Sequence, residues 1–250
     1  MEAPADAAPN AVPAPLHTGQ GARRYDSLSL RDRSEVTTIV EVLSLINAPS
    51  LADKRVLELA CGWGRLTLPM VAAGHPVLAT DLDPEALADL AEHLVPQGTV
   101  SAGIELRLTS MTAFSFDETF KAVCLPTGVT TLLDHTARRN ALERAVEHLA
   151  PGGMLIVSTD YILDSAPTTM CLALGPHTTL TEQVLPESDL RRMTLSWKDE
   201  LYSSDLHIVP ATWVSRTCTQ LGLTVTYQRS KPDPLLTGRV NAVIAAVKNP

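Results

Sequence analysis

Residues 54–90 have the sequence KRVLELACGWGRLTLPMVAAGHPVLATDLDPEALADL, and this stretch decides the fold. Short apolar runs at residues 56–59 and 77–80 predict two buried strands. Between them lie a glycine-containing turn, residues 60–64, and a segment with helical character, residues 65–73. This order is typical of a βαβ unit, which binds its ligand at the carboxyl ends of the parallel strands. The stretch therefore predicts a ligand site.

The residues of this unit also indicate which ligand it binds. Asp81 follows Gly62 by 19 residues, at the end of the second strand, where a carboxylate can accept hydrogen bonds from two ribose hydroxyls. Dinucleotide-binding proteins share this feature but prefer a third glycine where Thr67 stands here. Glu58 would repel phosphates and could accept hydrogen bonds from an ammonium group. S-adenosylmethionine (SAM) has a ribose, an ammonium and no phosphate, so SAM is favoured over NAD.

The motifs ELACGWGR and TDLDPEAL resemble the first two motifs of the class I SAM-dependent methyltransferases. Glu58, Gly62, Gly64 and Asp81 stand in the register of that family. The resemblance covers residues 25–249. It implies an α/β, Rossmann-like sheet of seven strands, with helices on both faces and the last strand antiparallel, and it implies S-adenosylhomocysteine as the product.

The resemblance also implies where the cofactor lies. A Tyr-Asp pair ahead of the core, here Tyr25 and Asp26, often contributes to a lid over it, and the loop after the fourth strand lies near the methyl group. This loop lacks the Asn-Pro-Pro-Tyr pattern of methyltransferases that act on nucleic-acid bases. The expected cofactor-binding residues are Tyr25, Glu58, Ala60, Cys61, Gly62, Gly64, Arg65, Asp81, Leu82, Ser110, Met111, Leu125 and Thr127.

The rest of the chain continues the alternation of strands and helices. Asp83 and Pro84 give a helix start signal, and the sequence LAPGGMLIVS at residues 149–158 predicts a helix end followed by a buried strand. We expect helices over residues 30–46, 84–94, 138–149 and 213–221, and strands over residues 104–108, 120–125, 154–158, 223–229 and 242–247.

Two regions depart from this alternation. Residues 1–22 are rich in Ala and Pro, so we expect a disordered tail. Residues 160–210 alternate polar and apolar side chains, and the segments 178–184 and 193–207 are typical of antiparallel strands. We therefore expect a single domain over residues 23–250, with an antiparallel β cap over about 160–210, inserted after strand five.

The composition excludes several function classes. A net charge of −8 and a pI near 5.3 argue against binding of nucleic acid. The four cysteines are far apart and form no C-x-x-C pair, so we expect no metal site and reduced core thiols. No apolar run is long enough to span a membrane and no signal pattern is present, which predicts a cytoplasmic protein without a membrane partner.

Methyl transfer from a sulfonium depends on alignment and desolvation more than on a particular acid or base. If the acceptor is an amine, a carboxylate or imidazole could take its proton. Asp160 and Tyr161 follow strand five, and His207 ends the cap, so these three are the candidate catalytic residues. The alternative for each is a solvated loop or edge-strand residue, and Asp134 is expected to cap a helix.

The cap and the acidic charge are similar to those of natural-product N-methyltransferases, which act on amino sugars or on daptide-type peptides. Thr130-Thr131-Leu132 and Ser158-Thr159-Asp160 replace the Gly-His-Leu and Glu-Pro-Trp of the amino-sugar enzymes, which argues against a sugar. We expect methyl transfer by in-line displacement to an amine, or a hydroxyl, of a small-molecule or peptide natural-product intermediate. The alternatives are an O-methyltransferase and a non-catalytic partner subunit, and a homodimer stays open.

Overall fold

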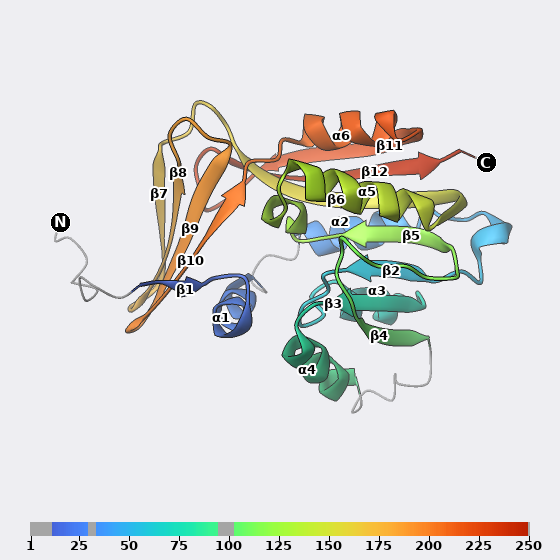
Figure 1. The fold of residues 1–250 in the computed structure, drawn as a ribbon, viewed down its shortest axis with the longest axis horizontal. Helices are drawn as coiled ribbons and strands as arrows, with labels where there is room; N and C mark the ends of the chain where they lie inside the picture. The colour runs from blue at the N-terminus through green and yellow to red at the C-terminus, as the bar shows by residue number, and fades with distance from the viewer. Residues whose placement is uncertain (1–11, 30–33, 95–102, 250) are drawn as a thin grey trace.

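The computed structural model describes residues 12–29, 34–94 and 103–249, which form a central sheet and a smaller cap sheet (Figure 1). The order of the central sheet is β11-β12-β6-β5-β2-β3-β4. Its strands are β2 (Val56–Leu59), β3 (Val77–Asp81), β4 (Ile104–Leu108), β5 (Phe120–Leu125), β6 (Leu149–Ile162), β11 (Leu223–Pro232) and β12 (Arg239–Lys248).

The pairing of these strands confirms the predicted fold. Strands β4, β3, β2, β5 and β6 are parallel to one another, whereas β12 runs antiparallel to both β6 and β11. The strand order reverses between β2 and β5, because β3 lies on one side of β2 and β5 on the other. Ligands of such sheets bind outside the carboxyl ends of the strands at this reversal.

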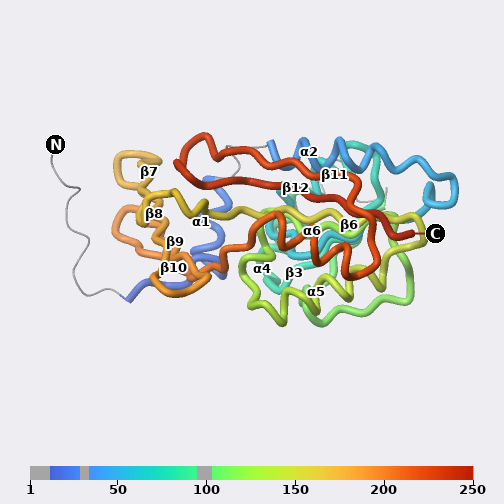
Figure 2. The backbone as a smooth tube through the Cα atoms, turned by 90° about the horizontal axis from the view of Figure 1, so that it is seen from above, coloured from blue at the N-terminus to red at the C-terminus, as the bar shows by residue number. Residues whose placement is uncertain are grey.

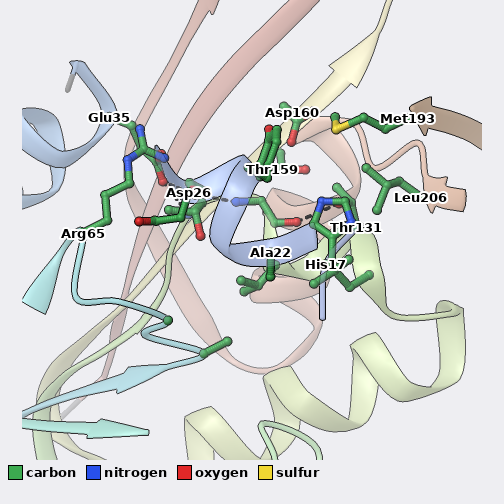
Figure 3. A pocket seen from close by; sticks show the side chains of 18 of the residues that line it. His17, Ala22, Asp26, Glu35, Arg65, Thr131, Thr159, Asp160, Met193 and Leu206 are labelled. Atoms are coloured by element: carbon green, nitrogen blue, oxygen red, sulfur yellow. Dashed lines mark hydrogen bonds and ion pairs between the residues drawn. The ribbon is translucent and has the colours of Figure 1, made fainter. Parts of the chain in front are cut away.

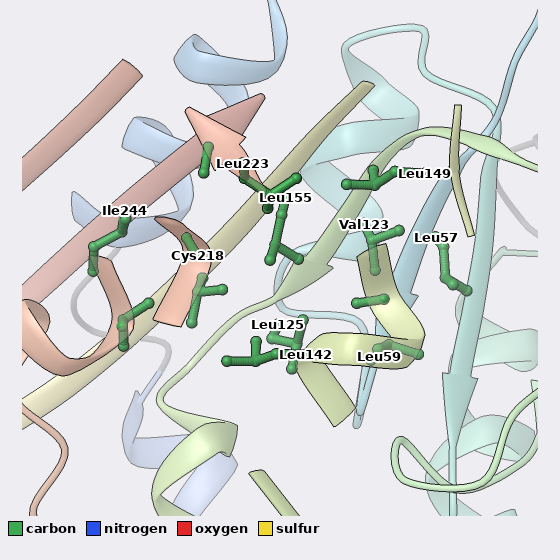
Figure 4. Close-up of a cluster of buried hydrophobic side chains, with 14 of the residues drawn as sticks. Leu57, Leu59, Val123, Leu125, Leu142, Leu149, Leu155, Cys218, Leu223 and Ile244 are labelled. Atoms are coloured by element: carbon green, nitrogen blue, oxygen red, sulfur yellow. The ribbon is translucent and has the colours of Figure 1, made fainter. Parts of the chain in front are cut away.

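Helices cover both faces of the central sheet, and each face has its own core. On one face, α2 (Ser34–Leu43), α3 (Thr67–Ala72) and α4 (Pro84–Leu94) pack on side chains such as Val56 and Cys124. On the other face, α5 (His135–Glu147) and α6 (Ala211–Gln220) pack on the alternate residues, including Leu57 and Val123 (Figure 4). Figure 2 shows β6, β11 and β12 between α2 and the pair α5 and α6. Because helices cover both faces of the sheet, its strands bury side chains on both faces, which explains their continuous apolar sequences.

The cap sheet has the order β1-β10-β9-β8-β7 and lies at one end of the central sheet (Figure 1). Its antiparallel strands are β7 (Thr169–Gly175), β8 (Thr178–Val184), β9 (Leu190–Trp197) and β10 (Glu200–His207). Chain segments far apart in sequence meet here, because the cap follows β6 directly and β1 joins its edge. The predicted cap after strand five is therefore present, and the segment expected at 193–207 is a hairpin that turns at Lys198, whose φ is 55°.

The amino-terminal prediction needs a correction. Residues 1–11 of the expected tail lie outside the described residues, but 12–22 are not a disordered tail. The strand β1 (Ala14–Pro15) pairs with β10, and helix α1 (Gly19–Ser29) follows it. This segment is ordered because Leu16 is fully buried among cap residues, a long-range contact that a local composition argument does not capture.

Most other element predictions agree closely with the structure. The exception is β6, which begins at Leu149, where a helix end and a turn were expected, and which continues past residue 158 to Ile162, so that it contains Asp160 and Tyr161. Strands β2, β4, β5 and β8 and helix α4 have the expected bounds. Helix α5 begins earlier than expected, at His135, because the side chain of Asp134 accepts a hydrogen bond from the backbone N–H of Ala137 at 2.8 Å and caps it. The start of the helix expected over residues 30–46 lies outside the described residues. No helix in the described ranges has the length and apolar character needed to cross a membrane.

Candidate active site

A cavity of ≈ 1260 Å³ lies at the carboxyl ends of the central strands and extends under the cap sheet (Figure 3). The glycine turn after β2, the end of β3, the loop after β5, the end of β6, helix α1 and the cap strands all contribute to its lining. Ligand pockets are usually roughly 300–1,000 Å³. The cavity is therefore large enough for two molecules held next to each other.

The glycine turn forms one end of the cavity. Gly62 has a φ of 51°, and no heavy atom lies within 4 Å of the place where a side chain would begin. Asp81 at the end of β3 accepts hydrogen bonds from the backbone N–H groups of Gly62, at 2.7 Å, and Asp83, at 2.9 Å. The turn therefore leaves open space, and its carboxylate is held in one orientation.

Glu58, which was expected to contact the ligand, lies beneath this turn and is not among the residues that line the cavity. Alternation along β2 places it on the face that α3 covers, where Oε2 accepts a hydrogen bond from the Thr67 hydroxyl at 2.5 Å. Among the described residues, Oε1 is buried without a hydrogen-bond partner. Burial raises the pKa of Glu58 to about 8, against the smaller, opposing effect of the Thr67 hydrogen bond.

This buried carboxyl predicts a pH dependence of stability. In the unfolded chain Glu58 ionises near its ordinary pKa of 4.5, so the folded state binds the proton more tightly between about pH 4.5 and about pH 8. Glu58 should therefore contribute a fall of roughly 2–5 kcal/mol in the free energy of unfolding as the pH rises through that window. His17, whose pKa is lowered to about 4, contributes in the opposite sense between about pH 4 and 6.5. Urea unfolding of the native protein and of Glu58→Gln at a series of pH values measures this contribution, because the native free energy should fall relative to that of the variant as the pH rises. Glu92→Gln, on the exposed face of α4, is the control, and an equal slope in Glu58→Gln would contradict the prediction.

Glu35 on α2 connects three parts of the site and was missed by the sequence analysis. Its Oε1 accepts hydrogen bonds from the backbone N–H of Thr127, at 2.6 Å, and from the Ser158 hydroxyl, at 2.5 Å. Its Oε2 lies 3.5 Å from the guanidinium of Arg65. Thr127 has a φ of 55°, which a non-glycine residue rarely adopts. Glu35 thus fixes the loop after β5 in a strained conformation beside the cavity.

A buried ion cluster stands where the central sheet meets the cap. Arg191 on β9 is fully buried and pairs with Asp160 and, at 2.5 Å, with Glu182. Arg239 on β12 pairs with the same two carboxylates and lies 3.7 Å from Asp233. Despite burial, which acts in the opposite sense, Arg191 and Arg239 hold the pKa of Asp160 below its ordinary value. Asp160 therefore stays ionised at the edge of the cavity.

His17, between β1 and α1, is a second residue that the sequence analysis missed. Its ring packs against Tyr25 at a centroid distance of 5.4 Å, and both residues line the cavity. Burial, followed by the charge of Arg191, lowers the pKa of His17 to about 4, so the imidazole is neutral at pH 7. Within the described residues its Nδ1 is buried without a hydrogen-bond partner.

Most of the predicted site residues are brought together by the fold. The cavity also receives the apolar Leu82 and Met111, which follow β3 and β4 in sequence. The predicted residues that line the cavity are Tyr25, Ala60, Cys61, Gly62, Arg65, Asp81, Leu82, Met111, Thr127 and Asp160.

Besides Glu58, five predicted residues lie elsewhere, and the reason differs for each. Gly64 packs under Leu90, which a Cβ at that position would strike, and Leu125 is fully buried in the core. The Ser110 hydroxyl is 2.9 Å from that of Thr112. The side chain of Tyr161 packs on the α5–α6 core, and His207 hydrogen-bonds Asp189 at 3.0 Å. Tyr161 and His207, which were expected to face the acceptor, are therefore not among the residues that line the cavity.

Comparison with known proteins agrees with this geometry. Residues 56–153 match the family model described as a methyltransferase domain. A ubiquinone biosynthesis O-methyltransferase of Xanthomonas oryzae pv. oryzae is 33% identical over 128 residues, which are 50% of this chain and 49% of that protein. The chain thus spans about half the length of the curated relatives it matches.

Solved structures match over more of the chain. A SAM-dependent methyltransferase from Clostridium acetobutylicum ATCC 824 has a TM-score of 0.71 at 16% identity, over 92% of this chain and 98% of that one. The glycopeptide N-methyltransferase MtfA, solved with SAM, has a TM-score of 0.62 at 26% identity, over 86% and 95%. These findings define the class: the chain has the class I SAM-dependent methyltransferase fold.

Proposed function

We propose that this protein is an enzyme that transfers a methyl group from SAM to an amine of a small-molecule or peptide intermediate of natural-product biosynthesis. The observation that carries the proposal is a single cavity that extends from the glycine turn and Asp81 to the space under the cap. The likeness to MtfA, a glycopeptide N-methyltransferase, supports an amine acceptor. The fold, the domain match and the cavity thus support one activity.

The residues at the glycine turn fit SAM. Asp81 would accept hydrogen bonds from the ribose hydroxyls, because both backbone hydrogen bonds to it fix its carboxylate at the cavity edge. The open space at Gly62 would admit the ligand close to the backbone. Leu82 and Met111 offer apolar contacts that would suit an adenine ring. Leu82 and Met111 would thus contact the adenine of an adenosyl group, and Asp81 would contact its ribose.

The chain's own contribution to the reaction is alignment and exclusion of water. When bound, SAM supplies an electrophilic methyl group on its sulfonium. Glu35 holds the loop after β5 in place, and α1 and the cap sheet enclose the acceptor side. Asp160 would orient the acceptor amine. Correct positioning of two reactants contributes at most about 7–11 kcal/mol to rate acceleration.

Titration calorimetry and a transfer assay test this function. The full chain should bind SAM with micromolar affinity, and it should pass a labelled methyl group from SAM to members of a panel of amines. If the protein does not bind SAM, the proposal is refuted. SAM binding without transfer to any acceptor, together with a stable complex with another protein in gel filtration, would instead support the non-catalytic partner.

A hydroxyl acceptor is the second candidate, because the 33% identical relative is an O-methyltransferase. A panel that pairs each amine with the alcohol of the same carbon skeleton separates the two. We expect label on the amines, and label confined to the alcohols would favour O-methylation. The cytoplasmic location, the homodimer and the absence of nucleic-acid binding stay predictions.

A further inference from the structure

The part of the cavity under the cap, which we call the cap-end compartment, has an apolar wall. Leu172 on β7 stands opposite Leu180 on β8, and Met193 on β9 stands opposite Ser204 on β10. Since alternate residues of a strand share one face, these side chains point to the same side of the sheet. The apolar residues of this wall that line the cavity are Leu172, Leu174, Leu180, Met193 and Leu206.

Asp160 offers this compartment one carboxylate oxygen that neither arginine of the ion cluster holds. Oδ2 of Asp160 is held by Arg191 and Arg239. Its Oδ1 faces Gly128, where a Cβ would strike it, and among the described residues it accepts no hydrogen bond. Position 128 also has a φ of 67°, so both the lack of space for a Cβ and the backbone conformation favour glycine there. The glycine therefore lets the Asp160 carboxylate lie against the backbone of the loop after β5, where Asp160 lines the cavity.

The charges around the compartment favour a cation over an anion. Within the buried ion cluster, three carboxylates, those of Asp160, Glu182 and Asp233, face two guanidinium groups, which leaves the cluster a net charge of −1. Arg229 and Lys231 also line the cavity, but both are exposed, so water and salt screen their charges. His17 adds no positive charge at neutral pH because its imidazole is uncharged. Figure 3 shows Asp160, His17, Met193 and Leu206 on one side of the pocket, apart from Glu35 and Arg65.

We propose that the cap-end compartment binds an amine with an apolar body, whose nitrogen contacts Asp160 and whose hydrocarbon part packs against the leucines and Met193 of the cap. This inference rests on the proposed function and specifies its acceptor. An amino sugar fits poorly, because its ring hydroxyls would face leucine side chains and lose hydrogen bonds to water. A carboxylic acid fits poorly because the buried ion cluster at this end of the cavity already carries a net negative charge.

Calorimetry with matched probes tests the inference on the full chain saturated with S-adenosylhomocysteine. The probes are hexylamine, 1-hexanol, hexanoate and glucosamine. Hexylamine should bind at least about tenfold more tightly than each of the others, a difference of about 1.4 kcal/mol. Leu172→Gln should weaken the binding of hexylamine about fivefold. It should leave the affinity for S-adenosylhomocysteine unchanged, because the side chain of Leu172 faces only the cap end. Ala173→Gln, on the opposite face of the same strand, should change neither affinity.

Every other outcome contradicts one defined part of the proposal. Equal or tighter binding of glucosamine refutes the apolar body, and equal or tighter binding of hexanol or hexanoate refutes the contact of a cationic nitrogen with Asp160. An unchanged hexylamine affinity in Leu172→Gln refutes the proposed position of the hydrocarbon part against the cap. A native protein that binds neither SAM nor S-adenosylhomocysteine refutes the proposed function itself, whereas SAM binding with the wrong ranking of probes refutes the acceptor class alone.

Discussion

Asp81→Ala should weaken SAM binding by on the order of 100-fold or more. The carboxylate would form two hydrogen bonds with the ribose, and a hydrogen bond to a charged group contributes about 1.5–3 kcal/mol. Its two acceptor contacts with the backbone N–H groups of Gly62 and Asp83 also shape the turn, so the substitution removes the orientation of the site as well as the contact. Titration calorimetry measures the loss directly, and fluorescence of Trp63, which lines the cavity, provides a second readout.

Asp134→Ala is the matched control. Asp134 is exposed, lies outside the cavity lining and caps α5 through Ala137. Its removal should lower the free energy of unfolding by about 0.5–2 kcal/mol and leave the affinity for SAM unchanged. If Asp81→Ala bound SAM as well as the native protein does, the cofactor would lie somewhere other than the glycine turn.

The parts of the structure that the sequence predicted well are local. The bounds of β2, β5 and α4 follow from short apolar runs and from one capping residue, all read within a dozen positions. The residues of the glycine turn and Asp81 also lie within one βαβ unit, so their proximity follows from its geometry. Glu58 shows the limit of this reasoning, because spacing placed it at the turn but did not show that its side chain points under α3.

The parts that could not be predicted depend on contacts between distant segments. Glu35 reaches Ser158 across 123 positions, and nothing near Glu35 in sequence indicates that contact. His17 lies in an Ala/Pro-rich segment whose order comes from the cap. Glu182 and Arg191 did leave a signal: both occupy the apolar phase of an alternating strand, as charged residues among Leu180, Met193 and Leu195. Opposite charges on one inward face indicate a buried ion pair.

Arg191→Met should lower the free energy of unfolding by about 3–5 kcal/mol, the usual cost of removing one partner of a buried ion pair. Arg191 and Glu182 are both fully buried, 2.5 Å apart, so the substitution leaves a carboxylate in the interior with Arg239 as its remaining cation. Arg192→Met is the control at the next position. Arg192 is exposed and pairs with Asp205 at 2.7 Å, so its loss should cost about 0–1 kcal/mol. Urea unfolding compares the two.

The double variant Arg191→Met, Glu182→Leu should recover part of that loss. Removing both charges leaves Arg239 with Asp160 and Asp233, whereas the single substitution leaves three carboxylates around one guanidinium group. If Arg191→Met were no more costly than Arg192→Met, the cluster would not hold the cap.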